Sequence, residues 1–284
     1  MSKEIVLEVQ DIVKTFPGVR ALDGVRFQLE VGEVHAIVGE NGAGKSTLMH
    51  ILGGIYRPDS GRILMDGKAI TLESAYDAAQ HGISVVFQEL SLAPNLSIAE
   101  NIFANRQPVD ALDLIDYEKL YADTREILKL FELDIDPKTL VKNLPVAQQQ
   151  VVEILKAISY RPKVLILDEP TSSLTSLEID MLFKNIRELK QRGISFIYIS
   201  HHLQEIFGIA DRVTVLRDGA YMGTRDVSDV TEEQLVQMMV GRELRDMYGT
   251  RDNNIGETYF QVKGAGRGKD FRDPPAFQDT RKVS

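Results

Sequence analysis

A glycine-rich stretch, residues 39–47 with the sequence GENGAGKST, constrains this chain more than any other feature. It fits the pattern G-x-x-x-x-G-K-[ST], with an apolar segment, 34–38, before it and a helical segment, 47–52, after it. Glycines let consecutive backbone N–H groups face one anion, and the helix N-terminus adds its dipole. Both flanks favour a phosphate-binding loop over a chance glycine turn. The candidate nucleotide-binding residues are Gly39, Glu40, Asn41, Gly42, Ala43, Gly44, Lys45, Ser46 and Thr47.

A second informative stretch is an apolar run, 164–167, that ends in two adjacent acids, Asp168 and Glu169. Ligands of α/β sheets bind at the carboxyl ends of the strands, which is where both acids are expected. We interpret Asp168 as a holder of hydrated Mg²⁺, and Glu169 as the base that orients and deprotonates an attacking water. The alternative, two acids that only solvate a strand end, loses weight beside the phosphate loop.

Apolar segments alternate with helical patterns along much of the chain, which indicates an α/β fold with a mostly parallel sheet. The predicted strands are 25–31, 34–38, 62–65, 84–87, 164–167, 195–199 and 213–216. The predicted helices are 47–52, 117–131, 148–159, 177–192 and 232–240. Between residues 90 and 144 helical periodicity replaces the strand signal, so we predict a helical insertion there.

Composition narrows the function classes. The 284 residues are 43% apolar and 26% charged, as in ordinary soluble globular proteins, and the net charge of -9 makes nucleic acid the weaker partner class. The absence of cysteine excludes disulfides and thiolate metal sites. No apolar run approaches the roughly 20 residues that span a bilayer, and the first residues lack a signal-peptide pattern, so we expect a cytosolic location.

Four further features distinguish among nucleotide-binding families. Gln88 follows an apolar strand, residues 144–150 begin the helix before the two acids, residues 172–175 follow those acids, and His201 follows the next strand. This order resembles that of the ATP-binding-cassette (ABC) ATPases over residues 4–245. The resemblance implies a P-loop NTPase fold with a mostly parallel core, an antiparallel β subdomain, and an α-helical subdomain at about residues 90–160.

The same resemblance implies ATP and Mg²⁺ as cofactors and gives several side chains a role. Glu169, His201 and Gln88 would be catalytic, with the His201 imidazole on the γ-phosphate and Gln88 on Mg²⁺ or the water. Ser46, Gln88 and Asp168 would form the metal set. Phe16 would stack on adenine, a contact worth roughly 1–3 kcal/mol, although an ordinary packed phenylalanine is the alternative.

Within the family, the segments FPGVRALDGV, EPTSSLT and ISHHLQEIFGIADRVTVLRDG resemble the ATPase subunits of bacterial monosaccharide importers of the ribose, galactose and xylose type. Those subunits carry two cassettes, and this chain has room for one. We interpret residues 246–284 as a linker with the start of a second cassette, at 259–263. The implied partners are that second cassette, membrane permease subunits and, indirectly, a sugar-binding protein. The implied location is peripheral, on the cytoplasmic face of the bacterial inner membrane.

The segment implied to contact the partner cassette's ATP departs from the family pattern. It comprises Leu144, Pro145, Val146, Ala147 and Gln148, where a serine and a glycine are usual. Pro145 offers neither a hydroxyl nor a backbone N–H, but proline suits a first helical turn, so we expect the following helix to form. The deficit would fall on the partner's nucleotide, while this chain's own phosphate site is complete.

Two other functions remain open. A soluble ABC ATPase acting on ribosomes or DNA would predict long coiled-coil insertions or basic arms, and neither is present. A nucleotide-binding regulator without turnover is kept open by Pro145 and Ala147.

Overall fold

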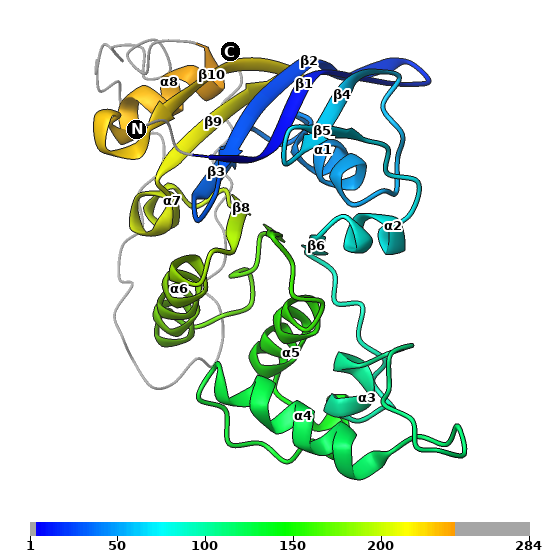
Figure 1. Ribbon diagram of the computed structural model, residues 1–284. Coiled ribbons are helices and arrows are strands. Elements are labelled where there is room, and N and C mark those ends of the chain that lie inside the picture. The colour runs from blue at the N-terminus through cyan, green and yellow to red at the C-terminus, as the bar shows by residue number, and fades with distance from the viewer. Residues whose placement is uncertain (1–3, 242–284) are drawn as a thin grey trace, which may run out of the picture. The chain divides into compact units, whose positions relative to one another are not determined.

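The computed structural model describes residues 4–241, which belong to one compact unit (Figure 1). Its centre is made of three five-residue strands in which every side chain is buried: β3 (Val34–Val38), β7 (Val164–Asp168) and β8 (Ser195–Ile199). These strands pair in parallel, β8 lying between β3 and β7. Parallel strands covered on both faces read as continuous apolar runs, which explains the sequence pattern.

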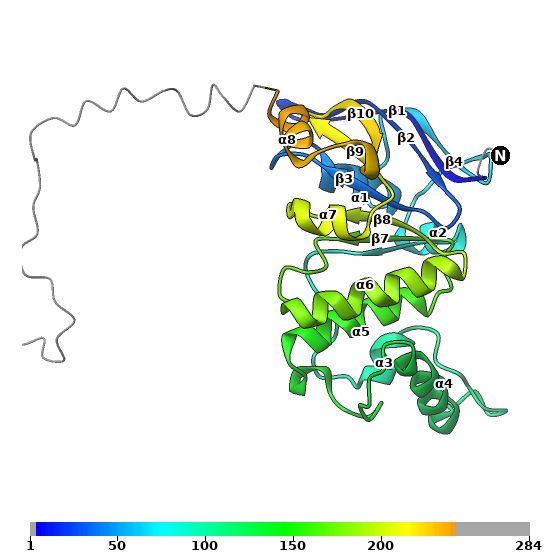
Figure 2. The ribbon, with the colours of Figure 1, turned by 90° about the vertical axis from the view of Figure 1, so that its left-hand side faces the viewer.

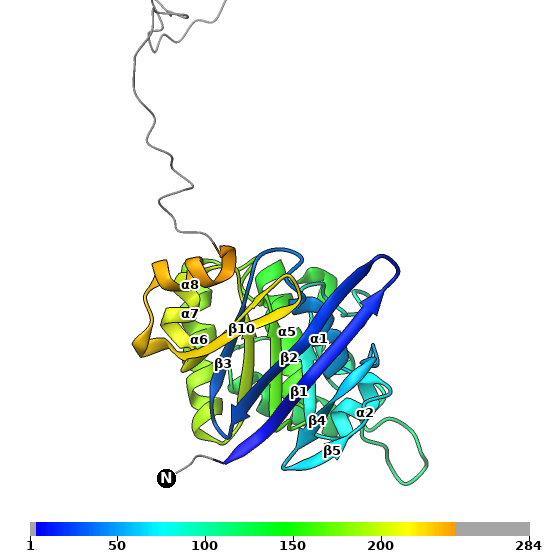
Figure 3. The same cartoon turned by 90° about the horizontal axis from the view of Figure 1, so that it is seen from above.

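A ten-stranded mixed sheet extends on both sides of this centre, in the order β5-β4-β1-β2-β10-β9-β3-β8-β7-β6. The remaining strands are β1 (Ile5–Phe16), β2 (Val19–Glu30), β4 (Ser60–Met65), β5 (Lys68–Ile70), β6 (Ile83–Val86), β9 (Arg212–Arg217) and β10 (Ala220–Asp226). Strands β5, β4, β1 and β2 pair antiparallel, and one residue pair, Ala220 with Asp23, joins them to β10. Seen from above, β1 and β2 run in front of the core strands (Figure 3).

Successive side chains of the central strands enter two different apolar cores, because a strand alternates its faces. Ile37, Ile166 and Ile197 pack with the antiparallel strands and α1 (Lys45–Leu52). Leu165 and Phe196 pack with the opposite layer, which contains α5 (Val146–Ile158), α6 (Ser176–Gln191), α7 (Leu203–Ile209) and α8 (Glu232–Val240). Figure 2 shows these layers in profile.

Helices fill the chain between β6 and β7, as the sequence predicts for this insertion. They are α3 (Ile98–Ile102), α4 (Tyr117–Lys129), the 3-10 turn η1 (Val141–Asn143) and α5. A capping box starts α3, where Ser97 and Glu100 satisfy each other's backbone amides. Two short helical segments, α2 (Ala75–Gln80) and η2 (Val227–Asp229), complete the described part of the chain.

The fold class is confirmed: a P-loop-type α/β core with a mixed sheet, an antiparallel region and helices. Several bounds differ from expectation. β1 is a long strand that the sequence analysis did not predict, and β2 begins at Val19 and not at residue 25. α5 begins at Val146, so Pro145 is its N-cap and not part of its first turn. The expected strand at 259–263 and the segment 246–284 lie outside the described residues.

Within residues 4–241, no helix is both long and apolar enough to cross a bilayer.

Candidate functional site

The glycine-rich loop connects β3 to α1, and its last glycine tolerates no side chain. Gly44 caps α1 with φ +99, in the left-handed region that favours glycine. A Cβ atom there would lie 2.6 Å from the Ala21 carbonyl oxygen and 2.7 Å from a Leu22 methyl carbon. The turn therefore lies directly against β2. With Gly44 in this position, α1 begins at Lys45, and its first three residues line the cavity described below.

The Lys45 side chain is buried under its own loop. Its Nζ donates to the carbonyl oxygens of Gly39 at 2.8 Å and Glu40 at 3.1 Å. Burial lowers the pKa of Lys45, and the nearby charges of Glu169 and Asp168 oppose that shift. Lys45 therefore places one positive charge at the loop, and this charge can neutralise an anion that the loop binds.

The two acids lie at the carboxyl end of β7, as the sequence predicts. Asp168 is the last residue of the strand and only 8% exposed. Burial raises the pKa of Asp168, and so does the charge of Glu169, while His50 and Lys45 lower it. Glu169 has φ +48, an uncommon conformation for a residue with a side chain, and its N–H donates to the Ile199 carbonyl at 2.9 Å. That bond fixes the acid against the end of β8.

Glu169 is the meeting point of three segments that are far apart in the sequence. Gln88, just beyond β6, donates from Nε2 to Glu169 Oε2 at 3.1 Å. His201, just beyond β8, lies with Nδ1 3.1 Å from Glu169 Oε1. His202 is the N-cap residue of α7, and its ring lies 4.0 Å from that of His201. His201 is thus the histidine that contacts the acid.

Lys45, Asp168, Glu169 and Gln88 border a cavity of about 600 Å³. Its lining is Phe16, Val19, Arg20, Ala21, Asn41, Gly42, Gly44, Lys45, Ser46, Thr47, Gln88, Asp168, Glu169 and Asp218. Most of the candidate residues therefore line this cavity. His201 does not line it, but contacts the lining residue Glu169. Phe16 is part of this lining, and its ring centroid lies 5.4 Å from that of Tyr56 in a T-shaped contact.

Sequence reasoning missed four residues of this lining. Val19, Arg20 and Ala21 begin β2, and Asp218 lies in the turn between β9 and β10 with φ +51. Arg20 also pairs with Asp23 at 2.8 Å. The dipeptide Asp218-Gly219 marks a turn in the sequence, but nothing local indicates that this turn borders the phosphate loop.

Ser46, Gln88 and Asp168 face the same cavity and fit a magnesium ion. Their hydroxyl, amide and carboxylate oxygens are the hard ligands that Mg²⁺ prefers. Gln88 uses its amide nitrogen on Glu169, so its carbonyl oxygen is the atom offered to a cation. Within residues 4–241 no cluster of three or more His, Cys, Asp or Glu side chains could hold a metal.

The segment 144–148 does not border this cavity. Leu144 is buried, Pro145 is exposed, and Val146 is 55% exposed at the start of α5. No side chain caps this helix. In its first turn, the backbone N–H of Gln149 donates a hydrogen bond to the Pro145 carbonyl oxygen at 3.1 Å. Ala147 and Gln148 therefore follow Pro145 on an uncapped helix start that is open to an external acceptor.

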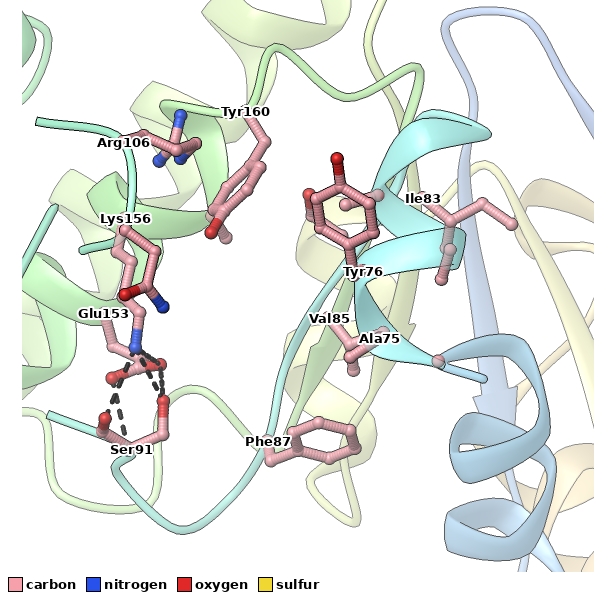
Figure 4. A pocket seen from close by; sticks show the side chains of 16 residues that line it. Ala75, Tyr76, Ile83, Val85, Phe87, Ser91, Arg106, Glu153, Lys156 and Tyr160 are labelled. Carbon is pink, nitrogen blue, oxygen red and sulfur yellow. Dashed lines mark hydrogen bonds and ion pairs between the residues drawn. The ribbon is translucent and has the colours of Figure 1, made fainter. Parts of the chain in front are cut away.

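A second cavity has a volume of about 400 Å³ (Figure 4). One side of it is formed by α2 and β6, and the other side by the helices of the insertion. Tyr76, Val85 and Phe87 form one wall, and Tyr160 belongs to the opposite wall. At the polar end, Glu153 accepts from the Ser91 hydroxyl at 2.6 Å, and Lys156 donates to the same hydroxyl at 2.9 Å. We call this cavity the groove. Phe87, which lines it, directly precedes Gln88 of the nucleotide cavity.

Comparison with known proteins gives a consistent picture. Residues 22–172 match the sequence profile of the family described as "ABC transporter". The chain is 47% identical to a putative ribose/galactose/methyl galactoside import ATP-binding protein of Burkholderia lata, over 95% of this chain and 51% of that protein. It is 45% identical to the galactose/methyl galactoside import ATP-binding protein MglA of Clostridium tetani, over 96% of this chain and 55% of that protein. The chain therefore spans about half the length of the curated relatives it matches.

Solved structures show the same fold. The ADP conformation of MJ1267, an ATP-binding cassette of an ABC transporter, matches with a TM-score of 0.72 at 26% identity, over 86% of this chain and 98% of that one. The cbiO1 protein of Clostridium perfringens, part of an ABC transporter complex, matches with a TM-score of 0.70 at 28% identity, over the same shares.

Proposed function

Because the chain belongs to the ABC transporter family, we propose that it is the ATP-hydrolysing motor of an importer for a monosaccharide. The cassette would comprise residues 4–245, with a helical subdomain at about 90–160 and a linker to a second cassette in 246–284. The relatives' names, which refer to ribose, galactose and methyl galactoside import, support the sugar class.

One observation carries the proposal: Gln88 and His201 both contact Glu169 at 3.1 Å, at the edge of the cavity that the phosphate loop forms. In this geometry Lys45 and the first amides of α1 hold the outer phosphates of ATP. Glu169 accepts the proton of the attacking water, and the contacts from Gln88 and His201 hold the Glu169 carboxylate in the orientation that this requires. Phe16, which is part of the cavity lining, supports the adenine.

Ser46, Asp168 and the Gln88 carbonyl would hold Mg²⁺, which supplies charge neutralisation to the phosphates when bound. Asp168 suits this role because it is buried at the strand end, where burial and the charge of Glu169 raise its pKa. A bound cation would lower that pKa and keep the carboxylate ionised.

The groove supports docking of a membrane permease. Its apolar walls, formed by Tyr76, Phe87 and Tyr160, suit an apolar face of a short helix, and its polar end suits that helix's terminus. A partner seated against Phe87 would be one residue from Gln88, and hence from the acid that Gln88 contacts. Such a partner would place the chain on the cytoplasmic face of the bacterial membrane as a peripheral subunit.

A second candidate function is a nucleotide-binding regulator without turnover, and the observation that favours it is the uncapped, proline-led start of α5. An ATPase assay separates the two. We expect the wild-type chain to hydrolyse Mg-ATP slowly alone and faster with the permease in proteoliposomes. Glu169→Gln should keep ATP binding and lower turnover about 10²- to 10⁴-fold, since the amide cannot accept the water's proton. Binding without turnover under both conditions would support the regulator, and wild-type-like hydrolysis by Glu169→Gln would remove Glu169 as the base.

A further inference from the structure

A buried carboxylate outside the nucleotide cavity joins two of the segments that form it. Glu205 lies in the first turn of α7 and is 8% exposed. Its Oε2 accepts from the Tyr198 hydroxyl at 2.8 Å and the Ser200 hydroxyl at 2.7 Å. Its Oε1 accepts from the Thr171 hydroxyl at 2.8 Å. Each hydroxyl has one proton to donate, so all three are committed to this carboxylate.

The bonds are buried and involve no cation among residues 4–241. Thr171, Tyr198 and Ser200 are all less than one-tenth exposed. Burial raises the pKa of Tyr198, and the charge of Glu205 raises it further, so the phenol remains a donor. A buried carboxylate without a cationic partner depends on its hydrogen bonds, and the loss of one leaves an unsatisfied acceptor. The three hydroxyls are therefore held tightly.

Two of the donors lie next to the catalytic candidates. Thr171 follows Glu169 by two residues, in the loop 169–175, and its carbonyl accepts from Leu174 N at 3.0 Å. Ser200 directly precedes His201, and its hydroxyl accepts from His202 N at 3.0 Å. Glu205 thus fixes one point in each of two loops, Thr171 in the first and Ser200 in the second, and Thr171 precedes Glu205 by 34 residues. The exposed contact between Glu169 and His201 depends on how these loops are placed.

We propose that Glu205 is a positioning residue that ties the loop 169–175 to the loop 200–202 and thereby sets the contact between Glu169 and His201. Glu205 does not line the nucleotide cavity and acts through the two loops. The expected effect of Glu205 on turnover rests on the proposed function. Its expected effect on the placement of the two loops is independent of that function.

The tie can be tested without catalysis, by amide hydrogen exchange followed by mass spectrometry on the full chain. Thr171→Val removes the hydroxyl at nearly constant volume, and Thr171→Ser retains it as the matched control. We expect Thr171→Val to raise exchange about tenfold in its own loop and also across the tie, in peptides covering 200–203, since a lost buried hydrogen bond is worth about 1.4 kcal/mol or a factor of ten. Thr171→Ser should restore the wild-type rates. Faster exchange confined to 169–175 would overturn the proposal.

Turnover gives the second measurement. Ser200→Ala and Tyr198→Phe each remove one donor to Glu205, but only Ser200 lies in a catalytic loop. We expect Ser200→Ala and Thr171→Val to lower kcat about tenfold with the KM for ATP within about twofold, and Tyr198→Phe to lower thermal stability comparably while kcat stays within about twofold. If kcat instead falls in proportion to the loss of thermal stability in all three variants, Tyr198→Phe included, the cluster only stabilises the fold and the proposal is wrong. If the wild-type chain does not turn over, the proposed function fails and the exchange experiment still decides on the tie.

Discussion

Acid should weaken this fold through one buried carboxylate, Glu33, in the turn that leads from β2 into β3. Its side chain is 1% exposed. Its Oε1 accepts from Arg212 Nε at 2.7 Å and contacts His35 Nδ1 at 2.9 Å, and its Oε2 accepts from Arg212 Nη2 at 2.8 Å and Glu30 N at 2.7 Å. Burial alone would raise the pKa of Glu33, but these bonds outweigh it and lower the pKa from 4.5 to about 2.

The direction of the effect follows from that shift. Because the folded-state pKa is lower than the unfolded one, ionised Glu33 stabilises the fold fully above pH 4.5, and the contribution disappears as the pH falls toward 2. One pKa unit corresponds to about 1.4 kcal/mol, so Glu33 contributes about 3 kcal/mol near pH 6 and about 1 kcal/mol near pH 3. This is large beside the roughly 5–15 kcal/mol that stabilises a typical domain.

The assay is urea unfolding of wild type and Glu33→Gln, followed by circular dichroism, from pH 6 down to pH 3. Glu33→Gln keeps the shape of the side chain and removes its titration. We expect the wild type to be more stable near pH 6 and the difference in unfolding free energy to narrow by about 2 kcal/mol toward pH 3. Parallel pH profiles for the two proteins would refute the reasoning, since they would show that Glu33 does not titrate in this range.

Two further predictions concern the nucleotide. Lys45→Ala should weaken Mg-ATP binding about 10- to 100-fold in a titration, because a charge-assisted contact to phosphate is worth about 1.5–3 kcal/mol; unchanged affinity would count against the phosphate loop. The double change Pro145→Ser with Ala147→Gly, made in the Glu169→Gln background, should raise ATP-dependent dimerisation in sedimentation while leaving the monomer's ATP affinity unchanged. A tight ATP-dependent dimer without the double change would show that Pro145 is tolerated opposite a phosphate.

Much of the core was predictable, because a buried strand imposes an unbroken apolar run on its sequence. β3, β7 and β8 are buried at every residue and apolar at all but one each, His35, Asp168 and Ser195, and candidate residues of the site follow each strand. β1 was missed because its alternation breaks at Asp11, which has φ +48 and lies within a register shift between Val9 and Ile12. Such an irregularity moves the following side chains to the other face of the sheet, so the alternation of apolar and polar residues along the strand is interrupted.

The missed helices were short ones. α2, α3 and α7 have six, five and seven residues, fewer than two full turns, so they show too little periodicity to be recognised. In the site, residues beside strand ends were predictable, whereas Arg20 and Asp218 enter the cavity lining through contacts between distant turns. Glu205 gave no local signal either, since its partner Thr171 precedes it by 34 residues.

We expect the departure at Pro145 to weaken a contact to a partner cassette's nucleotide without abolishing it. Pro145 lies just before α5, with φ -54 and ψ 150, and the helix that follows runs for 13 residues without a side-chain cap. The amides of Val146, Ala147 and Gln148 therefore lie in the first turn, where backbone N–H groups have no partner within the helix. A phosphate brought by a second cassette would lose the hydroxyl and the N–H that serine provides, but it would still meet these amides and the helix dipole. If a second cassette binds here, we therefore expect this segment to make a weaker, but not an absent, contribution to the nucleotide of that cassette.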